Sequence, residues 1–264
     1  MLSRVLRYLL KSFLIYELYE RLLIAEIKKA QIPTHVAIIL DGNRRWAKKH
    51  GMEPWYGHLR GAEKAEEVLD WCLELGIKII TMYVLSTENL KRDKKELNKL
   101  FEIIEEYLRK ALNNEKIHRY EVRIKAIGKL NLLPMNIREL IEELEEKTSK
   151  YDSHYLNIAI AYGGRSEIIE AVKKIAKDVK TGKVKVDEID EETFEHYLFT
   201  SHLPKQSPDL VIRTSGEVRL SNFLLWQSAY SELIFMDVYW PEFRKIDLLR
   251  AIRLYQQRHR RFGR

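Results

Sequence analysis

Cysteine is nearly absent from this chain of 264 residues, since Cys72 is the only one. A single thiol excludes an internal disulfide and a cysteine-based zinc site, and it fits a reducing compartment. Cys72 lies within an apolar helical pattern, which favours an inert buried thiol. The eight histidines show no metal-ligand spacing. A zinc enzyme is therefore not expected.

The signature loops of several enzyme classes are also missing. The chain contains no G-x-x-x-x-G-K-[ST], no G-x-G-x-x-G and no G-x-S-x-G segment. These absences argue against a P-loop nucleotide site, a dinucleotide site and the nucleophile elbow of an α/β-hydrolase.

Residues 1–30 contain no apolar run near the ~18 residues of a membrane-spanning helix, and no cleavage site follows their apolar part. Their apolar residues instead share one helical face, with Arg4, Arg7 and Lys11 on the other side. This amphipathic extension either packs on the protein or a second subunit, or lies on a membrane surface. We expect a cytoplasmic protein, free or held peripherally at the inner face of the membrane.

Basic residues outnumber acidic ones, 46 to 39, which gives a net charge of +7. Such a charge indicates an anionic partner: nucleic acid, an acidic membrane surface or a polyphosphate substrate. No aromatic-basic interleaving on the expected strands favours a nucleic-acid module. We therefore expect no nucleic-acid partner.

From Pro33 onward, apolar β-branched runs alternate with amphipathic helical patterns. The pattern predicts strands at 35–40, 77–86, 121–128, 155–162, 209–214 and 233–239. It predicts helices at 58–75, 93–113, 136–150, 165–180, 220–230 and 245–260. This alternation is typical of an α/β fold with a parallel sheet covered on both faces, here a single domain over residues 31–264. Ligands of such sheets lie beyond the carboxyl ends of the strands.

The first expected strand ends in Asp41-Gly42-Asn43, and Arg44, Arg45 and Trp46 follow on a helix start. Glycine lets the backbone approach a ligand, and the first N–H groups of a helix can bind phosphate. The carboxylate of Asp41 suits a bound cation. The segment therefore predicts an anion site beside a metal ligand.

Three more polar clusters flank expected strands. Ser86-Thr87-Glu88-Asn89-Leu90-Lys91-Arg92 ends the second strand, although by itself a helix N-cap at Ser86 or Thr87 is favoured. The segment 213–222 supplies Arg213, Arg219 and hydroxyl groups that can bind a diphosphate. Glu232 lies ahead of the last expected strand. A lone glutamate is usually a solvated or capping residue, and Glu232 is a candidate metal ligand only because the other polar clusters accompany it.

These clusters and an apolar interior fit a diphosphate substrate with an apolar tail. Mg²⁺ would bridge the diphosphate to Asp41, with Glu232 as a second candidate ligand. The acidic run 187–192 has no strand beside it and is interpreted as a solvated helix start.

Five ordered blocks carry a resemblance to a known family: HVAIILDGNRRWAKKHG (35–51), GHLRG (57–61), TMYVLSTENLKR (81–92), YGGR (162–165) and PDLVIRTSGEVRLSNFLLWQSAYSELIF (208–235). Over about residues 33–263 the chain resembles the cis-prenyltransferases, the undecaprenyl diphosphate synthase family. The resemblance implies a six-stranded, mostly parallel sheet and a homodimer. It also implies successive condensation of isopentenyl diphosphate onto an allylic prenyl diphosphate.

The resemblance also implies roles for single residues. Asp41 matches the essential aspartate that binds magnesium and assists diphosphate departure, and Asn89 matches the asparagine proposed to help remove a proton. Substrate contacts are implied for Gly42, Asn43, Arg44, Arg45, Trp46, His58, Ser86, Thr87, Glu88, Arg92, Arg213, Arg219, Leu220 and Ser221. Glu232 is implied as a second metal ligand, within the subunit or reaching the site of its partner. Arg261 and Gly263 match a tail that completes the site across the dimer interface.

Three positions depart from the bacterial pattern. Arg44 replaces a glycine, Leu90 replaces an aromatic residue, and Pro54 replaces a phosphate-binding arginine for which Arg60 or Lys48 could substitute. Together with the N-terminal extension, they resemble archaeal-type members, which make undecaprenyl diphosphate from geranylgeranyl diphosphate. A synthase of shorter cis-prenyl chains and a non-catalytic scaffold subunit of the same fold remain as alternatives.

Overall fold

The computed structural model describes residues 4–258, with side chains from residue 15 onward. Six strands form one sheet in the order β3-β4-β2-β1-β5-β6, and every neighbouring pair is parallel. The strands are β1 His35–Ile39, β2 Ile79–Ser86, β3 Val122–Ile127, β4 His154–Tyr162, β5 Leu210–Arg213 and β6 Glu232–Phe235. The six predicted strands are confirmed, and the sheet is parallel throughout rather than mostly parallel.

Strand β6 ends four residues earlier than the sequence predicts. Its neighbour β5 stops at Arg213, because the chain turns at Ser215 and Gly216, which have φ angles of 78° and 76°. The Met236 N–H still donates to the carbonyl of Arg213, the last residue of β5, at 2.8 Å. Beyond it the chain bonds to this turn, with the Ser215 N–H donating to the Val238 carbonyl at 2.7 Å.

Strand β1 is buried along its whole length. Val36 and Ile38 pack into the larger apolar core on one face of the sheet, and Ala37 and Ile39 pack into a smaller core on the other. Burial on both faces explains why the strand has a continuous apolar run rather than an alternating pattern.

The helices are α1 Arg4–Ile27, α2 Asn43–Lys49, α3 Pro54–Leu75, α4 Lys94–Leu112, α5 Glu115–Arg119, α6 Met135–Thr148, α7 Gly164–Lys180, α8 Glu191–Glu195 and α9 Lys245–Gln257. Helix α3 begins earlier than predicted because Pro54 occupies its first turn, where a missing N–H costs nothing. It ends at Gly76, whose φ of 77° gives a left-handed cap.

The predicted helix over 220–230 is wrong, because this segment is a series of turns. Ser221, Asn222 and Leu224 have positive φ angles of 50°, 66° and 42°, which a right-handed helix cannot contain. The turns bring Phe223 into the smaller core, where its ring stacks on Tyr83 with centroids 4.6 Å apart. This irregular segment therefore contributes Phe223 and Leu224 to the core on the second face of the sheet.

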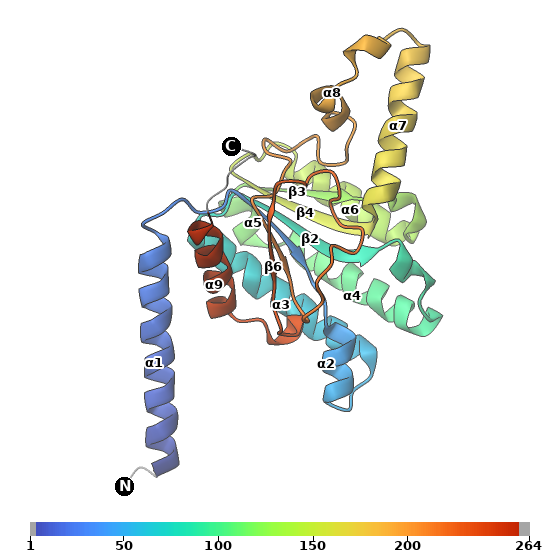
Figure 1. The fold of residues 1–264 in the computed structure, drawn as a ribbon. Coiled ribbons are helices and arrows are strands. Elements are labelled where there is room, and N and C mark those ends of the chain that lie inside the picture. The colour runs from blue at the N-terminus through green and yellow to red at the C-terminus, as the bar shows by residue number, and fades with distance from the viewer. Residues whose placement is uncertain (1–3, 259–264) are drawn as a thin grey trace.

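Helix α1 runs beside α9 and extends beyond the rest of the domain at its N-terminal end (Figure 1). Leu23 and Ile27 are fully buried in the larger core. Packing of the extension on the protein is thus confirmed for its C-terminal part. Ile15, Leu18 and Leu22 form an exposed apolar stripe on the same helix. None of the described helices is long and apolar enough to cross a membrane.

Candidate active site

A polar cavity of about 340 Å³ lies at the carboxyl edge of β1, β2 and β5, where parallel strands are expected to place a ligand. Eleven of the residues predicted from the sequence line it: Asp41, Gly42, Asn43, Arg44, Arg45, His58, Ser86, Asn89, Arg92, Arg213 and Ser221. Residues from the clusters after β1, β2 and β5 therefore meet in one cavity.

Asp41 lies two residues beyond the end of β1 and faces two arginines. Its Oδ2 accepts hydrogen bonds from Arg213 at 2.8 Å and from Arg45 at 3.4 Å. Burial alone would raise the pKa of this carboxyl group, but hydrogen bonds from Arg213 and Ser215 and the charges of Arg213 and Arg45 outweigh it. The pKa of Asp41 therefore lies below its ordinary value, and the side chain is ionised at neutral pH.

Arg213 is the buried cation of the cavity, with only 4% of its surface exposed. Besides Asp41, it donates to the Ser221 hydroxyl at 2.7 Å and to the Arg219 carbonyl. Its Nε is buried without a partner among the described residues. A buried guanidinium with one free donor is suited to an anionic ligand.

Close packing at three glycines fixes the turn after β1. A Cβ on Gly42, which has a φ of 109°, would lie 2.8 Å from the Tyr239 ring. Cβ atoms on Gly57 and Gly61 of α3 would lie 2.0 and 2.4 Å from oxygens of Asn43. Because these positions have no side chain, α2 and α3 approach closely and hold the Asp41 turn between the sheet and α3.

Glu96 of α4 lies among three basic side chains of the cavity wall. Its Oε1 is 3.3 Å from His58, 3.2 Å from Arg92 and 3.3 Å from Arg44. The His58 hydrogen bond and the two arginines lower the pKa of Glu96 against the effect of burial. The carboxylate therefore holds these groups in place at the rim of the cavity.

Ser86 and Asn89 bond to each other across the turn that follows β2. The Asn89 N–H donates to the Ser86 hydroxyl at 3.1 Å, and the Ser86 N–H donates to the Asn89 carboxamide oxygen at 3.3 Å. The N-cap residue of the short helix Glu88–Lys91 is Thr87, which makes no side-chain cap bond, whereas the Ser86 hydroxyl bonds to the first turn. Ser86 and Asn89 both line the cavity.

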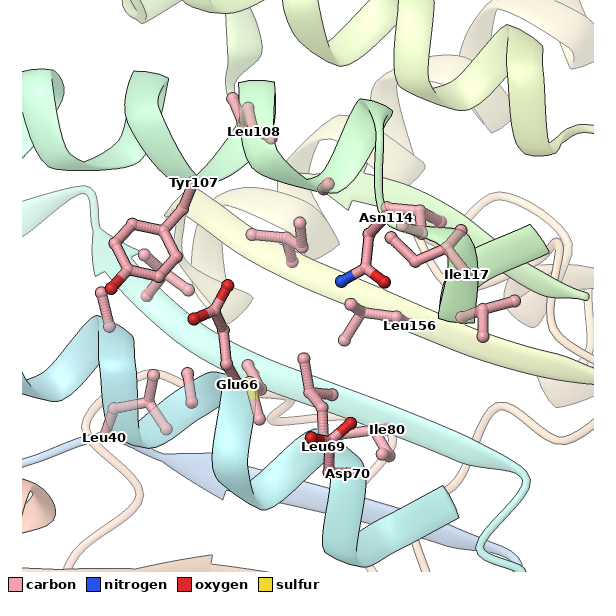
Figure 2. Close-up of a pocket in the computed structure, with 18 of the residues that line it drawn as sticks. Leu40, Glu66, Leu69, Asp70, Ile80, Tyr107, Leu108, Asn114, Ile117 and Leu156 are labelled. Atoms are coloured by element: carbon pink, nitrogen blue, oxygen red, sulfur yellow. The ribbon is translucent and has the colours of Figure 1, made fainter. Parts of the chain in front are cut away.

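An apolar cavity of about 430 Å³ adjoins the polar one (Figure 2). It lies between α3, α4 and the sheet, where most of its walls are Leu, Ile, Val, Ala and Met side chains. Leu40, Asn43, His58 and Val84 line both cavities. A ligand with an anionic head and an apolar tail can therefore occupy both at once.

Five predicted contact residues do not line the polar cavity: Trp46, Thr87, Glu88, Arg219 and Leu220. The Trp46 ring contacts the His50 ring at a tilt of 37°, and Leu220 packs against the smaller core. Arg219 is exposed and pairs with Glu217 at 2.7 Å. These residues lie in the same segments as the lining residues but are not part of the cavity wall.

Glu232 does not join Asp41 within one subunit. It opens β6 and is level with Leu210 and Val36, whereas Asp41 lies five residues beyond Val36 and two strands away. At ~3.3 Å per residue the offset along the strands alone is about 16 Å. Glu232 pairs with Arg258 at 2.7 Å, so a shared metal ion within one chain is excluded. Arg261 and Gly263 lie outside the described residues.

Neither substitute considered for the arginine missing at Pro54 reaches the cavity. Arg60 and Lys48 are absent from its lining, and Arg60 pairs with Glu63 on the surface. The arginines present there are Arg44, Arg45, Arg92 and Arg213. Arg44, one of the departures from the bacterial pattern, thus supplies part of the cationic wall.

Residues beside the predicted ones also contribute to the site. The Thr214 hydroxyl donates to the Asp41 carbonyl at 2.7 Å and accepts from the Asp41 N–H at 3.0 Å. Tyr83 lines the cavity from within β2. The R-T-S-G segment was recognised as polar, but no local signal distinguished Thr214 and Ser215 as the groups that hold Asp41.

The donor set fits magnesium better than a metal held by protein ligands alone. No group of three or more potential metal ligands occurs in the described part of the chain. Mg²⁺ commonly binds one or two carboxylates and takes its other ligands from substrate phosphates and water. The partly exposed carboxylate of Asp41, beside cations suited to phosphate, matches that arrangement.

A cationic cavity at the strand ends, joined to an apolar cavity beneath, defines a protein built to bind a lipid diphosphate. The family model described as putative undecaprenyl diphosphate synthase matches residues 39–263. The chain therefore belongs to the undecaprenyl diphosphate synthase family of prenyltransferases.

Two curated relatives are similar over nearly the whole chain. Both are named tritrans,polycis-undecaprenyl-diphosphate synthase (geranylgeranyl-diphosphate specific). The protein of Pyrococcus horikoshii is 55% identical over 100% of both chains. That of Methanopyrus kandleri is 56% identical over 99% of this chain and 96% of its own.

Two solved structures share the fold. Lavandulyl diphosphate synthase from Lavandula x intermedia, in complex with dimethylallyl diphosphate, has a TM-score of 0.85 and 39% identity over 88% of this chain and 99% of its own. A probable undecaprenyl diphosphate synthase from Campylobacter jejuni has a TM-score of 0.71 and 35% identity over 89% of this chain and 100% of its own.

Proposed function

We propose that this protein condenses isopentenyl diphosphate repeatedly onto geranylgeranyl diphosphate and forms a long polycis-prenyl diphosphate such as undecaprenyl diphosphate. The observation that carries the proposal is the shared wall between the polar and apolar cavities. A diphosphate head placed among the arginines leaves its prenyl tail beside Leu40 and Val84, at the entrance of the apolar cavity. The names of the archaeal relatives support the choice of primer.

The allylic diphosphate head would bind beside the turn after β1. Arg44 and Arg45 supply positive charge there, and Gly42 lets the backbone come close to the phosphate oxygens. Isopentenyl diphosphate would bind near Arg213 and Ser221, with the exposed Arg219 closing over it. The two reacting carbon atoms would then be held next to each other, which lowers the barrier to their joining.

Asp41 is the proposed magnesium ligand. Bound Mg²⁺ would neutralise the charge that develops on the departing diphosphate. The residues around Asp41 prepare this role: Arg213 and Ser215 keep the carboxylate ionised, and Thr214 fixes its backbone. Asn89, on the same cavity wall, is the proposed participant in removal of the proton from the new allylic centre.

We further propose a homodimer in which Glu232 and the Arg261–Gly263 tail act on the site of the partner subunit. The position of Glu232 at the opposite edge of its own sheet supports a role outside its own site.

The exposed Ile15, Leu18 and Leu22 stripe of α1 would allow peripheral contact with a membrane. Flotation with liposomes, compared with a chain lacking residues 1–30, tests this contact.

Asp41→Ala tests the catalytic proposal. The variant should lose prenyl transfer by several orders of magnitude while its circular dichroism stays unchanged, because Asp41 is partly exposed and carries no core packing. Asp187→Ala, which removes a carboxylate from the exposed acidic run, should retain full activity. Elongation of radiolabelled isopentenyl diphosphate by Asp41→Ala would show that the mechanism is wrong.

A further inference from the structure

Asn222 lies directly after Ser221, in the irregular segment that covers the second face of the sheet. It is half-buried and is not among the residues that line the polar cavity. Its φ angle of 66° is left-handed, a conformation that asparagine adopts more readily than most residues with a side chain. Both its backbone carbonyl and its carboxamide bond to other segments of the chain.

Three hydrogen bonds join Asn222 to these segments. Its carbonyl accepts from the Gly164 N–H at 2.7 Å, and its carboxamide oxygen accepts from the Arg165 N–H at 2.8 Å, both in the first turn of α7. Its carboxamide nitrogen donates to Oε1 of Glu88 at 3.0 Å, in the turn after β2. Asn222 therefore connects three parts of the chain that are distant in sequence.

These parts meet closely at Gly163. A Cβ there would lie 2.7 Å from Nδ2 of Asn222 and 2.9 Å from Oγ1 of Thr87. Burial would raise the pKa of the Glu88 carboxyl group, but hydrogen bonds from its own backbone N–H and from Asn222 contribute to a net lowering of that pKa. The Asn222 bond thus ends on an ionised carboxylate, which makes it stronger than a bond between neutral groups.

The bond from Asn222 to Glu88 joins two walls of the polar cavity. Asn89 follows Glu88 directly, and Ser221 precedes Asn222. Asn89 and Ser221 both line the cavity, and Ser221 accepts a hydrogen bond from Arg213 at 2.7 Å. The position of Asn89 relative to Arg213 and Ser221 therefore depends on a contact made behind the wall.

The geometry points to Asn222 as a positioning residue that holds Asn89 at a fixed distance from bound isopentenyl diphosphate. This inference rests on the proposed function, in which Arg213 and Ser221 bind that substrate and Asn89 takes part in removal of the proton. Without the bond to Glu88, the two walls can move relative to each other. A displacement of about 1 Å at a reacting centre can cost ~10²-fold in rate.

Asn222→Gly tests this role, because glycine keeps the left-handed backbone without strain and removes only the side-chain bonds. With saturating geranylgeranyl diphosphate and Mg²⁺, kcat/KM for isopentenyl diphosphate should fall roughly 10- to 100-fold, through a higher KM and a lower kcat. The KM for geranylgeranyl diphosphate should stay unchanged, because its head is proposed to bind beside Arg44 and Arg45 on the turn after β1.

Asn136→Ala is the matched control. It removes a comparable exposed bond, from the Asn136 carboxamide of α6 to Glu105 of α4, and neither residue lines a cavity. Both KM values and kcat should stay unchanged in this variant.

A reversal of the bond tests the contact with Glu88 itself. Asn222→Asp places two carboxylates against each other and should lower kcat/KM for isopentenyl diphosphate as Asn222→Gly does. Asn222→Asp combined with Glu88→Gln turns the bond around, since the new amide can donate to the new carboxylate. The double variant should therefore recover most of the kcat/KM that Asn222→Asp loses.

The outcomes separate this inference from the function on which it rests. Wild-type protein that makes no product with any primer would refute the proposed function. With active wild-type protein, unchanged constants in Asn222→Gly would refute only the positioning role. So would a lower kcat and a lower stability in urea at an unchanged KM for isopentenyl diphosphate, because these indicate a structural role alone. A double variant no more active than Asn222→Asp would refute the bond to Glu88 as the link.

Discussion

Gly42→Ala is the substitution whose effect follows most directly from the geometry of the site. The new Cβ would lie 2.8 Å from Tyr239 Cδ1, 3.0 Å from Tyr239 Cα and 3.1 Å from Ser215 Cβ, at a φ of 109°. Left-handed backbone costs a residue with a side chain roughly 1–2 kcal/mol. Overpacking against neighbours that include backbone adds about 1–3 kcal/mol. We expect a total loss of about 2–5 kcal/mol, measured by urea unfolding.

Gly51→Ala is the matched control, since Gly51 has a φ of 67° but no atom within 4 Å of the added Cβ. It should lose only the backbone part, about 1–2 kcal/mol. Gly42→Ala should in addition lower kcat/KM, because relief of the clash moves the turn that carries Asp41. Equal losses of stability and full activity in both variants would refute the proposed role of close packing at Gly42.

Three further predictions concern charge, burial and the cavity. Ser215→Ala removes a hydrogen bond that lowers the pKa of Asp41, so the acid limb of the kcat/KM profile should move to higher pH; an unmoved limb would contradict this. Burial lowers the pKa of His35 to about 3 and of His202 to about 4, below the ordinary 6.5. The unfolded chain therefore binds more protons than the folded chain between pH 4 and 6.5. The free energy of unfolding should decrease as the pH is lowered through this range, by up to about 1.4 kcal/mol per pH unit per histidine. Urea unfolding at pH 7 and 5 measures this, and His202→Gln should weaken the dependence. Ala65→Trp fills the apolar cavity from α3 and should shorten the products; unchanged lengths would place the tail elsewhere.

The strands and most helices could be predicted from the sequence because their burial determines the pattern of apolar residues along the chain. Buried parallel strands such as β1 are continuous apolar runs, and capped helices such as α4 begin at a recognisable residue, here Asp93. The segment 220–230 was predicted wrongly for the opposite reason. Its apolar residues fit a helical spacing, but tertiary packing of Phe223 on Tyr83 stabilises left-handed turns instead.

The site could be predicted to the level of loops but not of side chains. Polar residues at the ends of parallel strands must meet at one edge of the sheet, which brought Asp41, Ser86 and Arg213 together. The sequence does not indicate which way each side chain points, and Thr87 and Trp46 are not among the residues that line the cavity. Of the two positions left open for Glu232, the one within its own subunit does not fit, because Glu232 begins its strand and therefore lies at the other edge of the sheet.

In the proposed function one ligand occupies both cavities, with its diphosphate at Asp41 and its prenyl tail in the apolar cavity. Mass analysis of products from purified protein, Mg²⁺, isopentenyl diphosphate and a geranyl, farnesyl or geranylgeranyl primer tests it most directly. We expect long polycis-prenyl diphosphates, formed best from the geranylgeranyl primer and absent with Asp41→Ala. Short products formed best from the geranyl primer would contradict the proposed specificity, and no product from any primer would contradict the function itself.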